Sequence, residues 1–231
     1  MRATAAAAST RAGAEAGAAS AGYDSTAAVS PFKLASVLLQ YPTQALFAAL
    51  DDLAAVVSTV SPRESRAAFG RFVDWLRVKP GDQVAQHYVE TFDLRRRCAL
   101  YLTYFRYGDT RERGMSLLTF KSAYRAAGFV PTEDELPDYL PMVLDFAALS
   151  PPGERLLRSH RADVELLHRA LRQSQSPYAD VVLAVRAQLP RLGRREVTIV
   201  DKAWQEGPPK DSVGLEPFAP PEYLTGEAAR R

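Results

Sequence analysis

The side chains best suited to chemistry are three histidines and one cysteine, and their spacing does not favour a metal site. His160 and His168 would lie about two helical turns apart, too far to chelate one ion directly. Glu165 does not complete a recognised set of ligands with them. Histidines, including the third, His87, are often half-buried without any catalytic role. We therefore expect structural or surface roles for all three, with no metal and no cofactor.

The single cysteine, Cys98, is expected on an apolar helix face, where a thiol behaves as a small hydrophobic side chain. Reactive thiols need exposure and a cationic or helix-terminal setting, and Arg97 alone does not supply one. The sequence also contains no GxGxxG, P-loop, nucleophile elbow or paired-cysteine zinc pattern. We expect no enzymatic activity; a helical enzyme using His87, Glu90 and Cys98 is an alternative that requires a small-molecule pocket.

The segment around Cys98 combines apolar and charged residues at helical spacing, which predicts one helix from Asp93 to Tyr107, ended by Gly108. Its apolar face would comprise Leu94, Cys98, Tyr101, Leu102 and Phe105, and its charged face Arg95, Arg96, Arg97 and Arg106. Two interpretations stay open. The charged face is either a solvated, salt-bridged surface or the rim of an apolar groove that binds a peptide helix.

The charge balance limits the classes of partner. Lysine plus arginine number 29 against 27 acidic residues in a chain of 231, a net charge of +2, which gives no general field for nucleic acid or an anionic membrane. No apolar run approaches the roughly 20 residues that span a bilayer. The alanine-rich N-terminal segment is interrupted by Arg11 and Glu15, which argues against a signal peptide. We expect a cytoplasmic protein without nucleic-acid binding or stable membrane insertion, and a monomer is the simplest state.

Helical periodicity dominates the middle of the chain and predicts an all-α fold, a single globular domain of about eight helices over residues 31–192. Proline, glycine and capping signals separate the predicted helices, including a capping box formed by Ser61 and Glu64. We expect residues 1–30, which are rich in alanine, and residues 193–231, which are rich in proline, to be disordered tails.

Two stretches resemble a known family: "HYVETFDLRRRCALYLTYFRYGDTRERGMSLLTFKSAYRAAGF" and "ELPDYLPMVLDFAAL". They are similar to the nitrate reductase delta subunit, the NarJ type of assembly chaperone within the TorD-like group that serves molybdoenzymes. The resemblance runs from about Leu34 to Leu189. It implies an all-helical cytoplasmic chaperone that binds the apo catalytic (alpha) subunit of nitrate reductase, at its N-terminal segment, and keeps it competent for molybdenum cofactor insertion.

The same resemblance suggests a client-binding site. Tyr88 and Phe92 resemble an aromatic pair beside the family's peptide groove, although plain core packing explains them equally well. "ELPDYLP" corresponds to an acidic loop read in the family as a peptide-binding or hinge element. In this sequence Tyr139 replaces the loop's usual histidine, which puts any pH-dependent role of the loop in doubt, while Glu135 and Asp138 stay able to pair with basic client residues.

The predicted mechanism is binding without catalysis. An amphipathic client segment would lie near Tyr88, Phe92, Tyr104 and the helix after Asp138, with Arg106, Glu135 and Asp138 at the rim. The alternatives are a stable accessory subunit of the mature nitrate reductase, a chaperone for another molybdoenzyme, and a helical DNA-binding protein, which the interleaved acids disfavour.

Overall fold

The computed structural model describes residues 29–108, 110–131 and 134–209, and these residues form helices and their connections. The helices are α1 (Pro31–Leu38), α2 (Gln44–Ala48), α3 (Leu50–Thr59), α4 (Arg63–Val78), α5 (Gly81–Phe92), the 3-10 helix η1 (Arg96–Cys98), α6 (Tyr104–Tyr107), α7 (Arg111–Ala126), α8 (Leu140–Leu149), α9 (Pro151–Ser159), α10 (Arg161–Gln173), α11 (Tyr178–Arg186) and α12 (Arg194–Glu206). The all-α prediction is confirmed, with more and shorter helices than expected because several predicted spans are interrupted.

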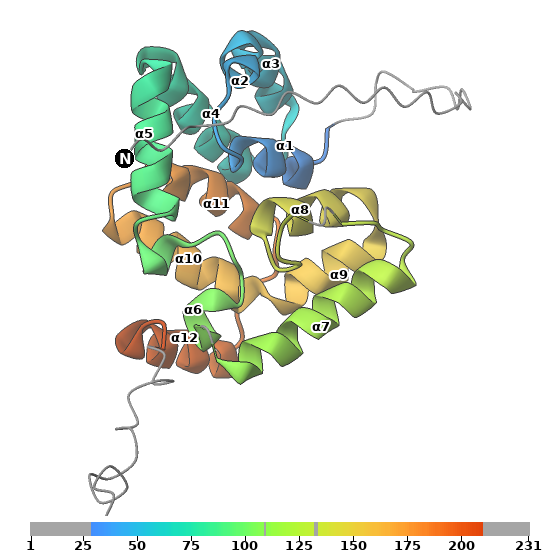
Figure 1. Cartoon of the computed structure of the whole chain (residues 1–231). Coiled ribbons are helices and arrows are strands. Elements are labelled where there is room, and N and C mark those ends of the chain that lie inside the picture. The colour runs from blue at the N-terminus through green and yellow to red at the C-terminus, as the bar shows by residue number, and fades with distance from the viewer. Residues whose placement is uncertain (1–28, 109, 132–133, 210–231) are drawn as a thin grey trace, which may run out of the picture.

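The core lies around α10 and α11 (Figure 1). Helix α11 packs against α4, α1 and α10, and α1 in turn packs against α8, which pairs with α9. Helices α7 and α12 lie at the edge of the molecule, α7 alongside α9 and α12 alongside α10 (Figure 1). In the described part of the chain, no helix is both long and apolar enough to cross a membrane.

The start of α4 is fixed by tertiary contacts instead of the predicted capping box. The helix begins at Arg63, and no side chain caps its first turn. The buried hydroxyl of Ser65 donates to the carbonyl of Ala184, 2.9 Å away, and the Gln188 amide donates to the Ser61 carbonyl over 2.6 Å. These contacts tie the start of α4 to α11 and to the turn after it. The Ser61–Glu64 box does not form, because Pro62 occupies the N-cap position and its side chain cannot accept a hydrogen bond.

The predicted helix over residues 93–107 is wrong. After η1 the chain leaves the helical path, forms an antiparallel bridge between Tyr101 and Tyr139, and turns at residues 102–103 into α6. The amide of Leu102 donates to the Asp138 carbonyl over 3.0 Å, and the amide of Leu140 donates to the Leu100 carbonyl over 2.7 Å. Leu94 is therefore 72% exposed and lies outside the core.

The burial of Cys98 is confirmed, with 2% of its surface exposed. Burial raises the pKa of its thiol, while the Ser174 hydroxyl and Arg95 act in the opposite direction with less effect. Cys98 therefore behaves as a core residue, and its thiolate is disfavoured.

Helix α12 lies beyond residue 192, in the segment for which the sequence predicted mostly disorder. This helix buries Val200 against the domain and ends at Gly207, whose φ of +72° is in the left-handed region. Proline-rich composition predicts disorder well only for segments with nothing to bury, and α12 carries Val200 and Trp204. The predictions for residues 1–28 and 210–231 lie outside the described residues.

Candidate functional site

Asp138 anchors the acidic loop from inside the molecule. It is fully buried, and its Oδ2 accepts hydrogen bonds from the amide and the hydroxyl of Thr103, at 3.1 and 2.5 Å. Its Oδ1 lies 3.6 Å from the Arg113 guanidinium. The prediction that Asp138 stands at an accessible rim is therefore wrong, because the start of α6 and the Arg113 cation both use its charge.

Arg113, Tyr101 and Tyr104 form a cation–π stack beside that loop. The guanidinium carbon of Arg113 lies 5.6 Å from the Tyr101 ring centroid and 5.2 Å from that of Tyr104, so two rings flank one largely buried cation. Arg96 donates to the Tyr104 hydroxyl over 2.9 Å. The Tyr101 hydroxyl donates to Glu135 Oε2 over 3.1 Å. Burial, followed by the Glu135 charge, raises the pKa of Tyr101 to about 12, so this hydroxyl stays a hydrogen-bond donor.

Arg106 serves the interior of the fold. Its Nε and Nη2 donate to the two carboxylate oxygens of Asp163 at 2.5 and 2.8 Å, and the Asp163 side chain is fully buried. Asp163 also lies 2.9 Å from Nδ1 of His160. Burial lowers the pKa of the Arg106 guanidinium, but Asp163 outweighs burial and raises it. Arg106 is thus engaged by Asp163, which limits its capacity to orient a bound segment.

Tyr88 and Phe92 belong to a buried aromatic cluster. Each is 6% exposed, their ring centroids are 4.8 Å apart, and both contact the ring of Tyr178. The Tyr88 hydroxyl donates to the Leu39 carbonyl over 3.2 Å. Burial raises the pKa of Tyr88 and of half-buried Tyr139 alike. The two α5 rings hold α5 against α11, as the core-packing interpretation expects.

A left-handed turn after α7 builds one wall of an apolar cleft. Gly128, with a φ of +65°, lets its own amide donate to the Arg125 carbonyl over 3.1 Å and the Phe129 amide donate to the Tyr124 carbonyl over 2.9 Å. This is the Schellman arrangement of a helix end. It returns the Phe129 ring to 5.2 Å from that of Tyr124 and 4.9 Å from that of Phe146.

The cavity between this turn and the acidic loop measures about 660 Å³, and we call it the α7–loop cleft. Its apolar walls are Phe129, Val130, Pro131, Leu136 and Pro137, and its charged residues are Lys121, Arg125 and Glu135. Val130 is 88% exposed and Leu136 is 41% exposed. Exposed apolar side chains with cations on one side and a carboxylate on the other fit an amphipathic segment that carries charges.

Among the residues predicted for the site, only Glu135 lines this cleft. The Tyr139 ring contacts Tyr101, which donates to Glu135, and Tyr104 shares the Arg113 cation with Tyr101. Tyr88 and Phe92 pack in the aromatic cluster on α5, and the Tyr88 hydroxyl also interacts with that of Tyr139. The sequence reasoning missed the apolar walls. The signal available was the run "GFVP", three apolar residues after a glycine in a segment rich in turn formers.

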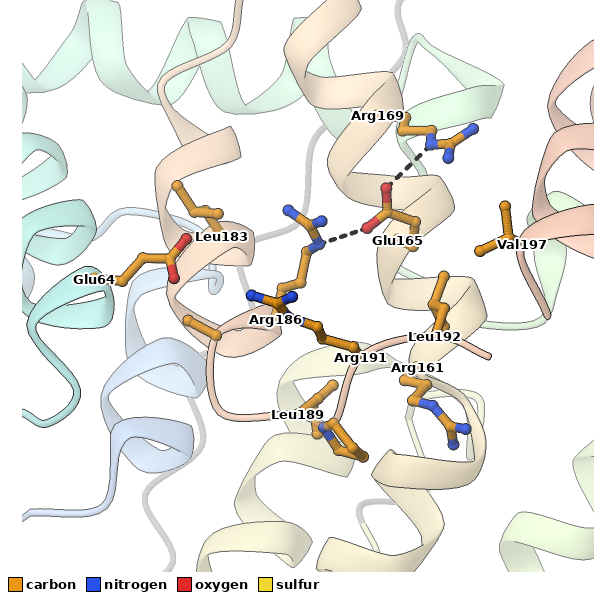
Figure 2. A pocket seen from close by; sticks show the side chains of 12 residues that line it. Glu64, Arg161, Glu165, Arg169, Leu183, Arg186, Leu189, Arg191, Leu192 and Val197 are labelled. Atoms are coloured by element: carbon orange, nitrogen blue, oxygen red, sulfur yellow. Dashed lines mark hydrogen bonds and ion pairs between the residues drawn. The ribbon is translucent and has the colours of Figure 1, made fainter. Parts of the chain in front are cut away.

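A second cavity, also about 660 Å³, lies among α10, α11 and the connection to α12. Four arginines line it, but Glu165 accepts from both Arg169 and Arg186 (Figure 2). Arg161 pairs with Glu196. Its charges are largely balanced by these pairs, so the cavity offers little excess charge for an anion. No group of three or more metal-binding side chains occurs within residues 29–108, 110–131 and 134–209.

Comparison with known proteins identifies relatives of the chain. The sequence pattern of the nitrate reductase delta subunit family matches residues 61–184. The probable nitrate reductase molybdenum cofactor assembly chaperone NarJ of Bacillus subtilis is 35% identical over 167 residues, which cover 71% of this chain and 91% of that protein. NarJ of Escherichia coli K12 is 33% identical over 151 residues, covering 63% of this chain and 64% of that protein.

A third relative shows the same similarity inside a longer protein. The nitrate reductase-like protein NarX of Mycobacterium tuberculosis is 41% identical over 156 residues, which are 67% of this chain and 23% of NarX. The family match includes α4 to α10 and most of α11, so it contains the α7–loop cleft. The chain therefore belongs to the nitrate reductase delta subunit family of NarJ-type molybdenum cofactor assembly chaperones.

Proposed function

We propose that this protein is a noncatalytic, cytoplasmic chaperone that binds an N-terminal segment of the apo catalytic (alpha) subunit of nitrate reductase. The names of its NarJ relatives support the process, molybdenum cofactor assembly in nitrate reductase. The observation that carries the binding mode is the α7–loop cleft, in which exposed apolar walls stand between Lys121 and Arg125 on α7 and Glu135 on the loop.

In this mechanism the client segment forms an amphipathic helix whose apolar face covers Val130 and Leu136. A basic client residue would pair with Glu135, and an acidic one with Lys121 or Arg125. Binding needs only to favour the open apo subunit over the closed one, because differential affinity alone shifts the population. The chaperone would hold the subunit open for cofactor insertion without contacting the cofactor.

Isothermal titration tests this with a synthetic peptide of about fifteen residues, or four helical turns, from the N-terminus of the nitrate reductase catalytic subunit of the same cell. Val130→Asp places a charge on the apolar wall and should weaken binding at least about tenfold. Val78→Asp is the matched control, since Val78 is an exposed valine at the end of α4, far along the chain from the cleft. Equal binding by both variants would mean that the segment docks elsewhere.

The ratio of this protein to purified nitrate reductase distinguishes a chaperone from a stable accessory subunit. The chaperone should be depleted from purified active nitrate reductase and enriched on the apo subunit. A fixed ratio to the active enzyme would reject the chaperone role.

A further inference from the structure

Helix α12 is held on the domain mainly by polar contacts. Of its residues only Val200 is buried, while Val197 and Ile199 are 39% and 47% exposed. Asp201 pairs with Arg169 on α10 at 2.7 Å, and Glu196 pairs with Arg161 at 2.6 Å. Such partly exposed ion pairs are weak and screened by salt. The helix is therefore attached less firmly than the helices of the core.

One aromatic side chain provides the other anchor. The Trp204 ring is stacked 5.8 Å from that of Phe105, with 12° between the planes. The Arg97 guanidinium lies 5.3 Å from the Trp204 ring and donates to the Trp204 carbonyl over 3.4 Å. Phe105 on α6 and Arg97 on η1 thus form a binding site for an aromatic residue on a docked helix.

The first half of α12 borders the second cavity. The second cavity of about 660 Å³ reaches Val197 and Leu192 on one side and Arg161 and Glu165 on α10 on the other (Figure 2). Val197 is the α12 residue that lines this cavity, and it is 39% exposed, so it contributes few dispersion contacts to the attachment of the helix. Removal of α12 would uncover Phe105 with three cations, Arg97, Arg161 and Arg169.

The uncovered surface continues into the stack beside the α7–loop cleft. Arg96 donates both to the Tyr104 hydroxyl, at 2.9 Å, and to the carbonyl of Pro209 just beyond α12, at 3.2 Å. The end of α12 therefore lies next to the residues that border the proposed client site.

We propose that α12 is an intramolecular occupant of a second segment-binding surface, formed by α10, η1 and α6, which fits an acidic amphipathic helix of the client protein. The proposal rests on the client-binding function above. The chemistry of the partner is that of α12 itself: carboxylates facing Arg161 and Arg169, and an aromatic residue one turn further along that stacks on Phe105. A client helix of this kind displaces α12, so the surface is available only while α12 is released.

The first test uses the full chain and a fluorescein-labelled peptide of residues 194–209. In the wild-type protein α12 competes with the peptide, so binding should be weak. Trp204→Ala removes the aromatic anchor and should tighten peptide binding at least about tenfold, because the open fraction of the surface rises. Asp201→Asn should act in the same direction with a smaller effect. Lys202→Ala is the control, since its ion pair is with Glu206 on the same helix.

Hydrogen exchange of the wild-type protein provides a readout that does not depend on any variant. The amides of α12 should exchange faster than those of α10, and faster still at high salt. Peptide binding that Trp204→Ala does not tighten, or α12 amides as protected as those of α10, would overturn the proposal.

The second test uses the apo catalytic subunit as the ligand. Trp204→Ala should raise its affinity, while Val130→Asp should lower it. If Val130→Asp lowers the affinity and Trp204→Ala does not raise it, the α12 surface is rejected as a client site and the cleft is retained. If Trp204→Ala raises the affinity and Val130→Asp does not lower it, the cleft is rejected and the α12 surface is retained.

Discussion

Removal of the Asp138 carboxylate should destabilise the whole domain, and the structure allows the size of the effect to be worked out. Asp138→Ala deprives the Thr103 amide and hydroxyl of their acceptor and leaves Arg113, which is 9% exposed, without this buried counter-charge. Removal of one partner from a buried charged pair costs about 3–5 kcal/mol. For a domain of this size each kcal/mol shifts Tm by about 2–4 °C, so we expect Tm to fall by roughly 6–20 °C.

Two further variants separate charge from hydrogen bonding. Asp138→Asn keeps an oxygen that accepts from Thr103 and loses the charge beside Arg113. We therefore expect the free energy of unfolding to fall by about 1.5–3 kcal/mol. Glu135→Ala removes an exposed carboxylate whose hydrogen bond is to the Tyr101 hydroxyl, and should cost less than about 1 kcal/mol. Urea unfolding followed by circular dichroism gives the free energies of unfolding directly.

The reasoning fails if Asp138→Ala stays within about 1 kcal/mol of the wild-type protein or if Glu135→Ala is the more damaging change. The result also governs any test of binding. A variant with arginine at both Glu135 and Asp138 would bury a cation beside Arg113, so loss of client binding by that variant would report unfolding. Val130→Asp is the better probe of the site because Val130 is exposed.

Three further predictions concern the packing, the histidines and the cysteine. An added methyl group in Gly153→Ala would lie 2.2 Å from a backbone oxygen of α8 and should destabilise by about 1–3 kcal/mol or more, whereas Gly70→Ala meets nothing within 4 Å and should stabilise by up to about 1 kcal/mol in urea unfolding. Burial lowers the pKa of His87 and His168, so the unfolded chain binds protons more readily. The free energy of unfolding should therefore fall as the pH drops below about 6.5, and glutamine at both positions should flatten that dependence in unfolding midpoints between pH ~7.5 and ~5. Burial raises the pKa of the Cys98 thiol, and a thiol reagent should modify the folded protein at least about tenfold more slowly than the urea-unfolded chain.

Helical periodicity predicted the fold because most core contacts involve helices whose apolar face can be recognised from a short stretch of the sequence. In α4 the spacing of Phe69, Phe72, Val73 and Leu76 was sufficient, and all four are buried. Local pattern failed where a distant segment sets the backbone. Residues 93–107 have a helical period, yet they form two short helical segments, η1 and α6, interrupted around Tyr101, where the backbone pairs with the loop around Tyr139.

Helix α12 escaped prediction for a related reason. Its own composition gives it few residues to bury, and Arg161, Arg169 and Phe105, which hold it, lie far away in the sequence. A segment can therefore be rich in charge and close to prolines and still be ordered, provided that the domain supplies partners.

The family resemblance rests largely on buried residues, whereas part of the candidate cleft lies outside the matching stretches. The two stretches that carry the resemblance, residues 87–129 and 135–149, contribute Tyr88, Phe120, Tyr124 and Asp138 to the interior. Val130 and Pro131, which wall the α7–loop cleft, fall in the gap between the stretches. Buried residues determine the fold, and their regular spacing can be recognised in the sequence. The exposed residues of the cleft, Val130 and Leu136, have no such periodicity, so the three-dimensional structure was needed to identify them as parts of one candidate binding surface.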